Sequence, residues 1–324
     1  MAPAWNRRRS AAPHYDQTFG DKALSAACED MVMGRWEGAH DLLATGPHRD
    51  WDRRSHRIRL LAHTAADKRI VEAWQTAQPN SADAVVLRAD TEVMRLFAAA
   101  RMGTPPSAGS LDRTAHICLN ASEAFPEDPH PWVSLITLGR LYGSGTHSMN
   151  RWWPELLARD RYHREGHHQA LRYMSARWHG SHGQAYAFAR DCAVYAPAGS
   201  SLLVMPQIAR AEEFRHRTEA EGARPHTMVG FWAGERWDLV ETMERWIAVR
   251  SPVEAAQDVA DLNHLAHGLA QAGLLVEAAE VFDLLKGRAT RAPWSYTGDA
   301  EAEYMRWRDR SSRAAAEHTD SRKG

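Results

Sequence analysis

The densest group of potential metal ligands in the chain is a run of histidines between residues 163 and 182. His163 and His167 are four residues apart, so a continuous helix would place both imidazoles on one face, as in a two-ligand metal site. Glu165 stands between them, in an order that differs from the His-Glu-x-x-His of zinc proteases. Gly166 weakens a helix at this turn. We therefore keep a metal site at His163 and His167 as an alternative, and prefer to interpret these histidines as solvent-exposed.

The rest of the sequence contains no recognised nucleophile or nucleotide-binding motif. There is no Gly-x-Ser-x-Gly, no Walker loop and no dinucleotide glycine fingerprint. Cys28, Cys118 and Cys192 lie far apart, which favours core thiols in a reducing cytoplasm over a disulfide framework. We therefore expect no catalytic residue and no cofactor, and we predict a non-catalytic protein.

The elements that would position any site are helices, and residues 259–293 show the pattern most clearly. Apolar or small residues recur there at spacings of three and four, as on one face of an amphipathic helix. These residues are Leu262, Leu265, Ala266, Leu269, Ala278 and Phe282. Gly273 interrupts the pattern, where a residue that tolerates positive φ suits a tight turn. Pro293 follows the second half, where a helix can no longer continue. The segment predicts a helical hairpin that turns at Gly273.

Weaker copies of this pattern lie upstream, at residues 20–46 and 166–197. In the second copy, Gln169 and Arg172 occupy positions that the pattern gives to large apolar residues. Over roughly two-thirds of its length the chain resembles the tetratricopeptide-like superfamily, whose repeat is a 34-residue helical hairpin. The segment RWHGSHGQAYAFA at residues 177–189 also resembles part of a bacterial tetratricopeptide-like family of unknown function. The resemblance implies a right-handed superhelix of helical hairpins.

That superfamily usually binds peptides or protein partners in its concave groove, often through Asn, Arg or Lys side chains. Arginine suits bidentate contacts with carboxylates. The repeat frame turns six residues of this chain toward the groove: Asn263, His267, His130, Arg140, Arg177 and His167. The resemblance therefore implies peptide contacts at these positions, although the same residues could simply solvate the groove.

Composition sets limits on the classes of partner. The chain has 324 residues, 44% hydrophobic and 25% charged residues, and a formal net charge of −1. Such a balance gives no electrostatic reason to expect nucleic acid or a membrane as partner. No stretch approaches the ~20 apolar residues that span a bilayer. The N-terminal arginines lack an apolar run behind them, so we expect no signal peptide and a location in a bacterial cytoplasm.

We therefore predict an all-α fold, an irregular tetratricopeptide-like α-solenoid of roughly a dozen helices. It would span residues 20–310, between a basic disordered tail at 1–19 and a disordered tail at 311–324. The predicted function is that of an adaptor that binds an unidentified protein or peptide, with no prediction of oligomeric state. The alternatives are a metal-dependent enzyme with a histidine-rich site around residues 163–182 and a regulatory module that senses a ligand or peptide.

Overall fold

The protein is mainly helical in the part of the chain that its computed structural model describes, namely residues 12–45, 50–143, 148–223, 228, 230–232, 236–251 and 255–321. Fifteen α-helices and no β-strand occur in these ranges, which confirms the predicted all-α class. None of these helices is both long and apolar enough to cross a lipid bilayer. The helices are α1 (Lys22–Val32), α2 (Glu37–Ala44), α3 (Trp51–Ala65), α4 (Ile70–Ala77), α5 (Ala82–Arg101), α6 (Ala108–Ala124), α7 (His130–Gly139), α8 (Ser148–Arg159), α9 (Arg164–Met174), α10 (His182–Tyr195), α11 (Met205–Glu219), α12 (Arg236–Arg245), α13 (Asp258–Gln271), α14 (Leu275–Leu285) and α15 (Ala300–Ser321). Short 3₁₀ helices are η1 (Ser201–Val204), η4 (Ile247–Val249) and η5 (Trp294–Tyr296).

Capping side chains explain where several helices begin. The side-chain oxygens of Asp21, Ser81, Ser107 and Ser181 each accept a hydrogen bond from the backbone N–H three residues further on. Such caps satisfy donors that the first helical turn leaves without partners, and each stabilises a helix by roughly 1 kcal/mol. Pro206 lies in the first turn of α11, where its missing N–H costs nothing.

Helices α13 and α14 form the predicted hairpin. Gly273 connects them with a φ of +77°, in the left-handed region. A Cβ atom at this position would meet no other atom within 4 Å, so the turn requires glycine for its backbone conformation alone. The residues predicted to pack between the two helices are all buried: Leu262, Leu265, Ala266, Leu269, Ala278 and Phe282. The prediction of a helical hairpin at residues 259–293 is confirmed.

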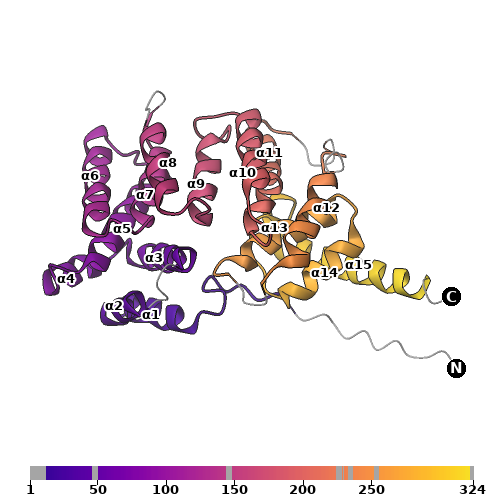
Figure 1. Ribbon diagram of the computed structural model, residues 1–324, viewed down its shortest axis with the longest axis horizontal. Coiled ribbons are helices and arrows are strands. Elements are labelled where there is room, and N and C mark those ends of the chain that lie inside the picture. The colour runs from indigo at the N-terminus through magenta and orange to yellow at the C-terminus, as the bar shows by residue number, and fades with distance from the viewer. Residues whose placement is uncertain are drawn as a thin grey trace.

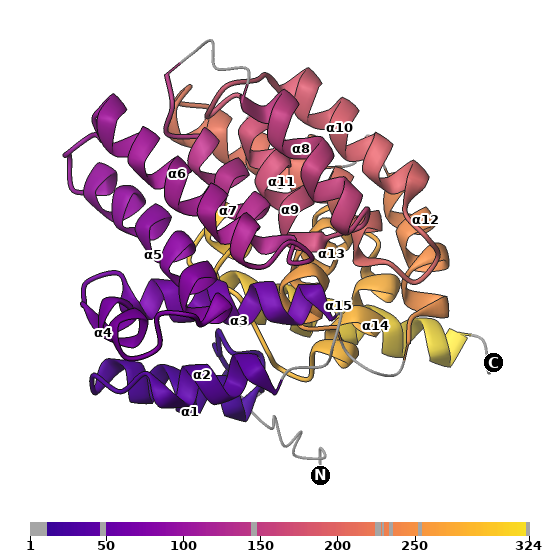
Figure 2. The same cartoon turned by 60° about the vertical axis from the view of Figure 1, so that its left-hand side comes forward.

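Consecutive helices pack on one another and share two large hydrophobic cores. One core runs from Leu24 on α1 to Ala170 on α9, and the other from Leu171 on α9 to Trp307 on α15. Helix α9 therefore supplies adjacent residues to different cores. In Figure 1, α1–α8 and α10–α15 occupy the two sides of the molecule, and α9 lies between them. Figure 2 shows α1 and α2 beside α3 at one edge.

The segment before α1 reaches the opposite half of the protein. The backbone N–H of His14 donates to the carbonyl of Gly287 at 2.8 Å, and the N–H of Ala289 donates back to His14 at 2.9 Å. The ring of Phe19 stacks on His56 of α3, with centroids 5.1 Å apart. The prediction of a disordered tail over residues 1–19 is therefore wrong for residues 12–19, because backbone pairing and ring packing hold them; residues 1–11 lie outside the described residues.

The predicted C-terminal tail also needs correction. Helix α15 continues to Ser321, so residues 311–321 of the predicted tail at 311–324 are helical, and 322–324 lie outside the described residues. Tyr304, Trp307 and Ser311 are buried at spacings of three and four. This stripe anchors the helix, and its polar C-terminal turns extend from it.

Candidate ligand-binding site

Two of the predicted groove residues belong to the interior of the C-terminal half. Asn263 donates from Nδ2 to the carbonyl of Val259 at 2.7 Å and accepts from Nε1 of Trp294 at 2.8 Å. His267 is fully buried between the rings of Trp232 and Trp294, with centroids 5.0 and 5.1 Å away. Both polar groups of the Asn263 side chain have partners within the protein, whereas Nδ1 of His267 is buried without one in the described chain. Neither residue lines the cavity described below.

A chain of hydrogen bonds engages two of the predicted histidines from both sides. The N–H of Gly166 donates to Nδ1 of His163 at 3.1 Å, so the neutral ring carries its proton on Nε2. That nitrogen donates to Oγ of Ser55 at 2.9 Å, and the hydroxyl donates onward to Nδ1 of His130 at 2.8 Å. Nε2 of His130 then faces Asp90 at 3.6 Å. Both ring nitrogens of His163 therefore already have protein partners.

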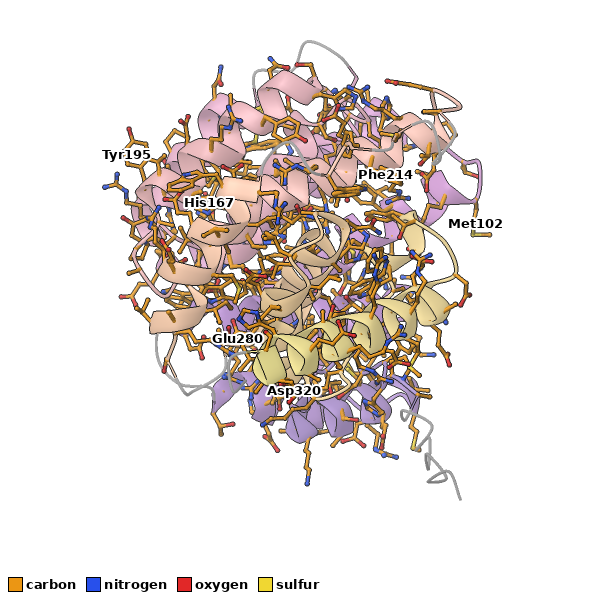
Figure 3. All side chains as sticks on the ribbon, turned by 90° about the vertical axis from the view of Figure 1, so that its right-hand side faces the viewer. Met102, His167, Tyr195, Phe214, Glu280 and Asp320 are labelled. Carbon is orange, nitrogen blue, oxygen red and sulfur yellow. The ribbon has the colours of Figure 1, made fainter. Side chains whose placement is uncertain are left out.

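His167 also lies in the interior. Its Nδ1 donates to the carbonyl of His163 at 2.8 Å, and its ring meets Trp153 edge-on at 5.0 Å between centroids. In Figure 3 it lies within the helical body, whereas Met102 and Tyr195 project at opposite edges. Burial lowers the pKa of both His163 and His167 to about 4, so both are neutral at pH 7. The interpretation of these histidines as solvent-exposed was wrong, because both are buried among protein side chains.

A buried ion pair connects α9 to α13. Nε and Nη2 of Arg164 each donate to one carboxylate oxygen of Asp261, both at 2.6 Å, in a bidentate arrangement. Burial alone would lower the pKa of Arg164, but the charges of Asp261 and Glu165 outweigh it and raise that pKa. Glu165 lies 3.3 Å from Arg164 and 3.4 Å from Arg59 of α3. Helices α3, α9 and α13 are thus held together by charged groups at the boundary of the two cores.

Beside this network lies a partly enclosed cavity of about 420 Å³, bounded by α3, α5, α9, α13 and the end of α7. Its charged lining consists of five arginines and one glutamate: Arg59, Arg101, Arg140, Arg164, Arg172 and Glu165. Buried carboxylates offset part of this charge, since Asp261 pairs with Arg164 and Asp90 lies 3.5 Å from Arg59. The remaining arginines give the cavity a surplus of positive charge.

Arg140 carries part of that surplus. Its guanidinium lies over the rings of Phe97 and Trp178, at 4.7 and 5.2 Å from their centroids. It forms no ion pair with a carboxylate of the described chain, and neither does Arg172. Burial, together with the charges of Arg172 and Arg59, lowers the pKa of Arg140 well below its usual value. An anion in the cavity would relieve this repulsion.

The cavity also presents polar atoms that lack partners. Five lining residues each have a buried side-chain atom without a hydrogen-bond partner in the described part of the chain: Arg59 Nε, His168 Nε2, Gln169 Oε1, Gln257 Oε1 and His264 Nδ1. Burial and nearby positive charge lower the pKa of His264 to about 3, so its ring stays neutral. Buried polar groups of this kind are normally satisfied by protein, water or ligand.

The two glutamines have a defined orientation. Nε2 of Gln169 donates to Glu165 Oε1 at 2.5 Å, and Nε2 of Gln257 donates to Glu165 Oε2 at 3.3 Å. Because both amide nitrogens face the same carboxylate, both amide oxygens are left to accept from elsewhere. The cavity therefore combines fixed hydrogen-bond acceptors with two guanidinium groups that lack a carboxylate partner in the described chain.

Of the six predicted groove residues, Arg140 alone lines this cavity. Arg177 is exposed just after α9, and the others are buried among protein partners. The residues that the sequence analysis missed lie mostly on α9, where Arg164, His168 and Arg172 recur four residues apart. A signal was present, because Gln169 and Arg172 stand at positions where the repeat pattern requires large apolar residues.

Comparison with known proteins adds no relative: the chain matches no model of a protein family, no curated protein and no solved structure.

Proposed function

We propose that the protein is a non-catalytic binding module, and that its ligand presents a carboxylate to the cavity beside α9. The observation that carries the proposal is the position of Arg140 and Arg172, which line the cavity without a carboxylate partner in the described chain. Guanidinium groups match carboxylates in bidentate geometry, and a partly buried site makes that interaction stronger than it is in water.

The glutamine acceptors narrow the ligand further. Gln169 and Gln257 each present an amide oxygen that needs a donor. A carboxylate would pair with the arginines, and neighbouring N–H groups would donate to the glutamine oxygens. A peptide carboxyl terminus has both a carboxylate and N–H groups. A free amino acid has the same two groups. The volume of about 420 Å³ falls within the range of small-ligand pockets. We therefore infer recognition of a peptide carboxyl terminus, with a free amino acid as the other source of the same chemistry.

The architecture that we propose for this module is a right-handed tetratricopeptide-like superhelix. Support comes from the order of packing, because α5 packs on α6, α10 on α11 and α13 on α14, as in a stack of helical pairs. The turn at Gly273 fits the repeat pattern. The handedness follows from the resemblance of the sequence. The cavity would then lie on the inner side of the superhelix.

The test is a binding titration with peptides that differ only at the carboxyl terminus. A library of short peptides with free carboxyl termini is screened first, and each binder is then compared with its amidated form. Loss of the charged contact should weaken binding about 10- to 100-fold. Equal binding of both forms would overturn carboxylate recognition. A free amino acid that binds as tightly as the peptide would instead favour the ligand-sensing alternative.

Variants place the contact within the protein. Arg172→Gln should weaken binding of the free-carboxyl peptide about tenfold or more, because it removes an arginine that lines the cavity and forms no ion pair with a carboxylate of the described chain. Arg177→Gln is the matched control, since Arg177 is an exposed arginine after the same helix and does not line the cavity. An effect of Arg177→Gln equal to that of Arg172→Gln would place the ligand outside the cavity. The enzyme alternative at His163 and His167 gains no support, because both ring nitrogens of His163 are engaged.

A further inference from the structure

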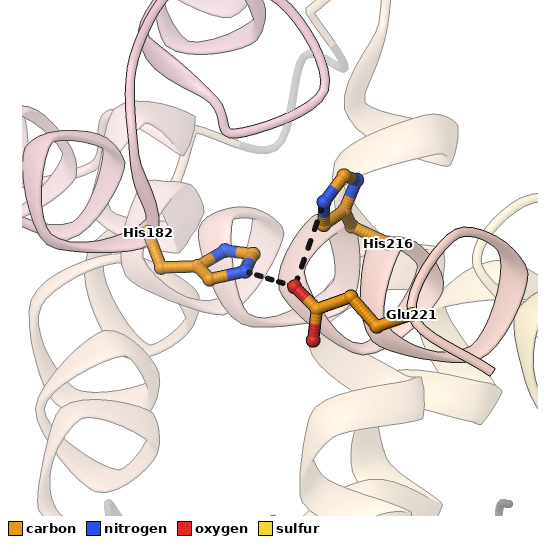
Figure 4. A group of neighbouring side chains, drawn as sticks. All are labelled: His182, His216 and Glu221. Atoms are coloured by element: carbon orange, nitrogen blue, oxygen red, sulfur yellow. Dashed lines mark ion pairs between the residues drawn. The ribbon is translucent and has the colours of Figure 1, made fainter. Parts of the chain in front are cut away.

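A second group of histidines lies at the ends of α10 and α11. His182 is the first residue of α10, His216 lies in the last turn of α11, and Glu221 follows that helix by two residues. One ligand atom from each of the three lies within 4.8 Å of the other two. Figure 4 shows the two imidazoles converging on the carboxylate from different helices.

The separations suit a shared cation better than direct hydrogen bonds. Nε2 of His182 lies 3.7 Å from Glu221 Oε1, and Nε2 of His216 lies 3.6 Å from the same oxygen. Both distances exceed a good N–H···O hydrogen bond. Metal–ligand bonds of ~2.0–2.2 Å in tetrahedral geometry place ligand atoms roughly 3.3–3.6 Å apart. The two histidine–carboxylate separations exceed these values by only a few tenths of an ångström, and all three ligand atoms lie within 4.8 Å of one another.

The local fold holds the three residues in place. The side chain of Ser181 caps α10 and so fixes the start of the helix that carries His182. The N–H of Glu221 donates to the carbonyl of His216 at 3.4 Å, so these two ligands belong to one turn of chain. Helices α10 and α11 pack against each other. The local fold therefore keeps all three ligands on the same side of the α10–α11 contact without metal bound.

The availability of the donor atoms is an independent observation. Nε2 of His182 is buried and has no hydrogen-bond partner in the described chain. The side chains remain reachable, with 26% of His182, 21% of His216 and 50% of Glu221 exposed. The other candidate group, Asp52, Asp160 and His163, differs in this respect, because both ring nitrogens of His163 are engaged.

We propose that His182, His216 and Glu221 form a site for Zn²⁺. Two imidazole nitrogens and one carboxylate suit zinc, whereas Ca²⁺ and Mg²⁺ prefer oxygen ligands alone. Three protein ligands leave at least one coordination position for water or another ligand, as in open zinc sites. The ion would connect the start of α10 to the end of α11. This site shares no residue with the cavity beside α9, so a test of one proposal does not decide the other.

The test uses the full chain, freed of metal by a chelator and titrated with ZnCl₂ in a calorimeter. One equivalent of Zn²⁺ should bind, and the melting temperature should rise as it does. His216→Ala and Glu221→Gln should each weaken binding about 100-fold or more, because each removes a direct ligand. His318→Ala is the control, since His318 is an exposed histidine at the last turn of α15; it should leave the affinity unchanged.

Two further readouts keep the proposal open to refutation. Co²⁺ in place of Zn²⁺ should give an intense visible absorption, which His216→Ala abolishes. The circular dichroism of metal-free His216→Ala and Glu221→Gln should equal that of the parent, because both side chains are partly exposed. Absence of saturable Zn²⁺ binding, or equal affinity in folded His216→Ala and the parent protein, would overturn the site.

Discussion

Helix α9 and the hairpin α13–α14 both contribute many residues to the interior, but they bury different types of residue. The two helices of the hairpin pack on each other through leucine, alanine and phenylalanine at repeat spacing, from Leu262 to Phe282. Its buried polar residues, such as Asp261 and Asn263, contact other elements instead. Helix α9 buries eight consecutive residues, from Arg164 to Leu171, and five of the eight have charged or polar side chains. The repeat pattern matches the apolar packing of the hairpin but not the polar residues of α9. The comparison teaches that the cavity lies where the sequence departs from the repeat pattern, rather than where it matches.

The largest expected effect is a loss of folding stability at acid pH, because histidines in both regions are buried whereas surface histidines are not. Burial lowers the pKa of His163 and His167 to about 4 and that of His264 and His267 to about 3, from 6.5 when exposed. At a pH between the folded and the exposed pKa values, the unfolded chain binds more protons than the folded protein does. The stabilising contribution is therefore complete above pH 6.5 and is lost as the pH falls, by about 1.4 kcal/mol per histidine per pH unit. The melting temperature should fall steeply from pH 6.5 to 4.

The acid effect can be assigned to individual side chains. His167→Phe should move the midpoint of acid unfolding to lower pH, because the ring packs against Trp153 and no longer takes up a proton. His318→Ala, at an exposed site, should leave the midpoint in place. Asp52 opposes the trend, since burial raises its pKa to about 6 and the folded state binds its proton more tightly than the unfolded state between pH 3.8 and 6. Unfolding that is independent of pH over this interval would contradict the burial of the histidines.

An intermediate effect is expected where the two regions meet. Asp261→Ala leaves Arg164 buried beside Glu165 without its bidentate partner, and should lower the free energy of unfolding by about 3–5 kcal/mol. Urea denaturation at pH 7 measures this change. Glu219→Ala disrupts the exposed pair with Arg215 and should cost less than about 0.5 kcal/mol. Similar losses in both variants would show that the buried network has no special role in holding α9 to α13.

The smallest effect belongs to the turn of the hairpin. Gly273→Ala adds a Cβ atom that meets nothing within 4 Å, so only the left-handed backbone conformation resists it. The cost should be about 1–2 kcal/mol in urea denaturation. Because the added Cβ atom meets no titratable side chain within 4 Å, this loss should stay the same between pH 5 and 8. A loss that grows toward acid pH would indicate that the hairpin and the ionic network are not separable.

The periodicity of apolar residues predicts a helix correctly where the buried residues are also the apolar ones. The all-α class and the α13–α14 hairpin could be predicted because leucine and alanine repeat on one face and Gly273 marks the turn. The end of α15 could not, since its last turns carry few apolar residues and depend on the stripe that Tyr304 and Trp307 anchor further back. Residues 12–19 lack any periodic signal and are held by pairing with a distant segment.

The candidate site was predictable only in part. The repeat frame singled out Arg140 as a ligand-facing residue, and Arg140 lines the cavity. The same frame misplaced His267 and Asn263, because spacing says which way a side chain points and not whether another helix covers it. The contacts of Arg164 with Asp261 and of His182 with Glu221 join separate helices. Such pairings depend on tertiary packing, which no local pattern records.

The backbone pairing of His14 with residues 287 and 289 has a consequence for how the molecule comes apart. A linear stack of helical pairs can fray from either end, one pair at a time, because each pair contacts only its neighbours. Here the chain ahead of α1 is bound to the segment that follows α14, and Phe19 is packed on α3. The first helices therefore cannot separate from the rest without also breaking the pairing of His14 with this distant segment. We expect this pairing to couple the unfolding of the two ends of the chain.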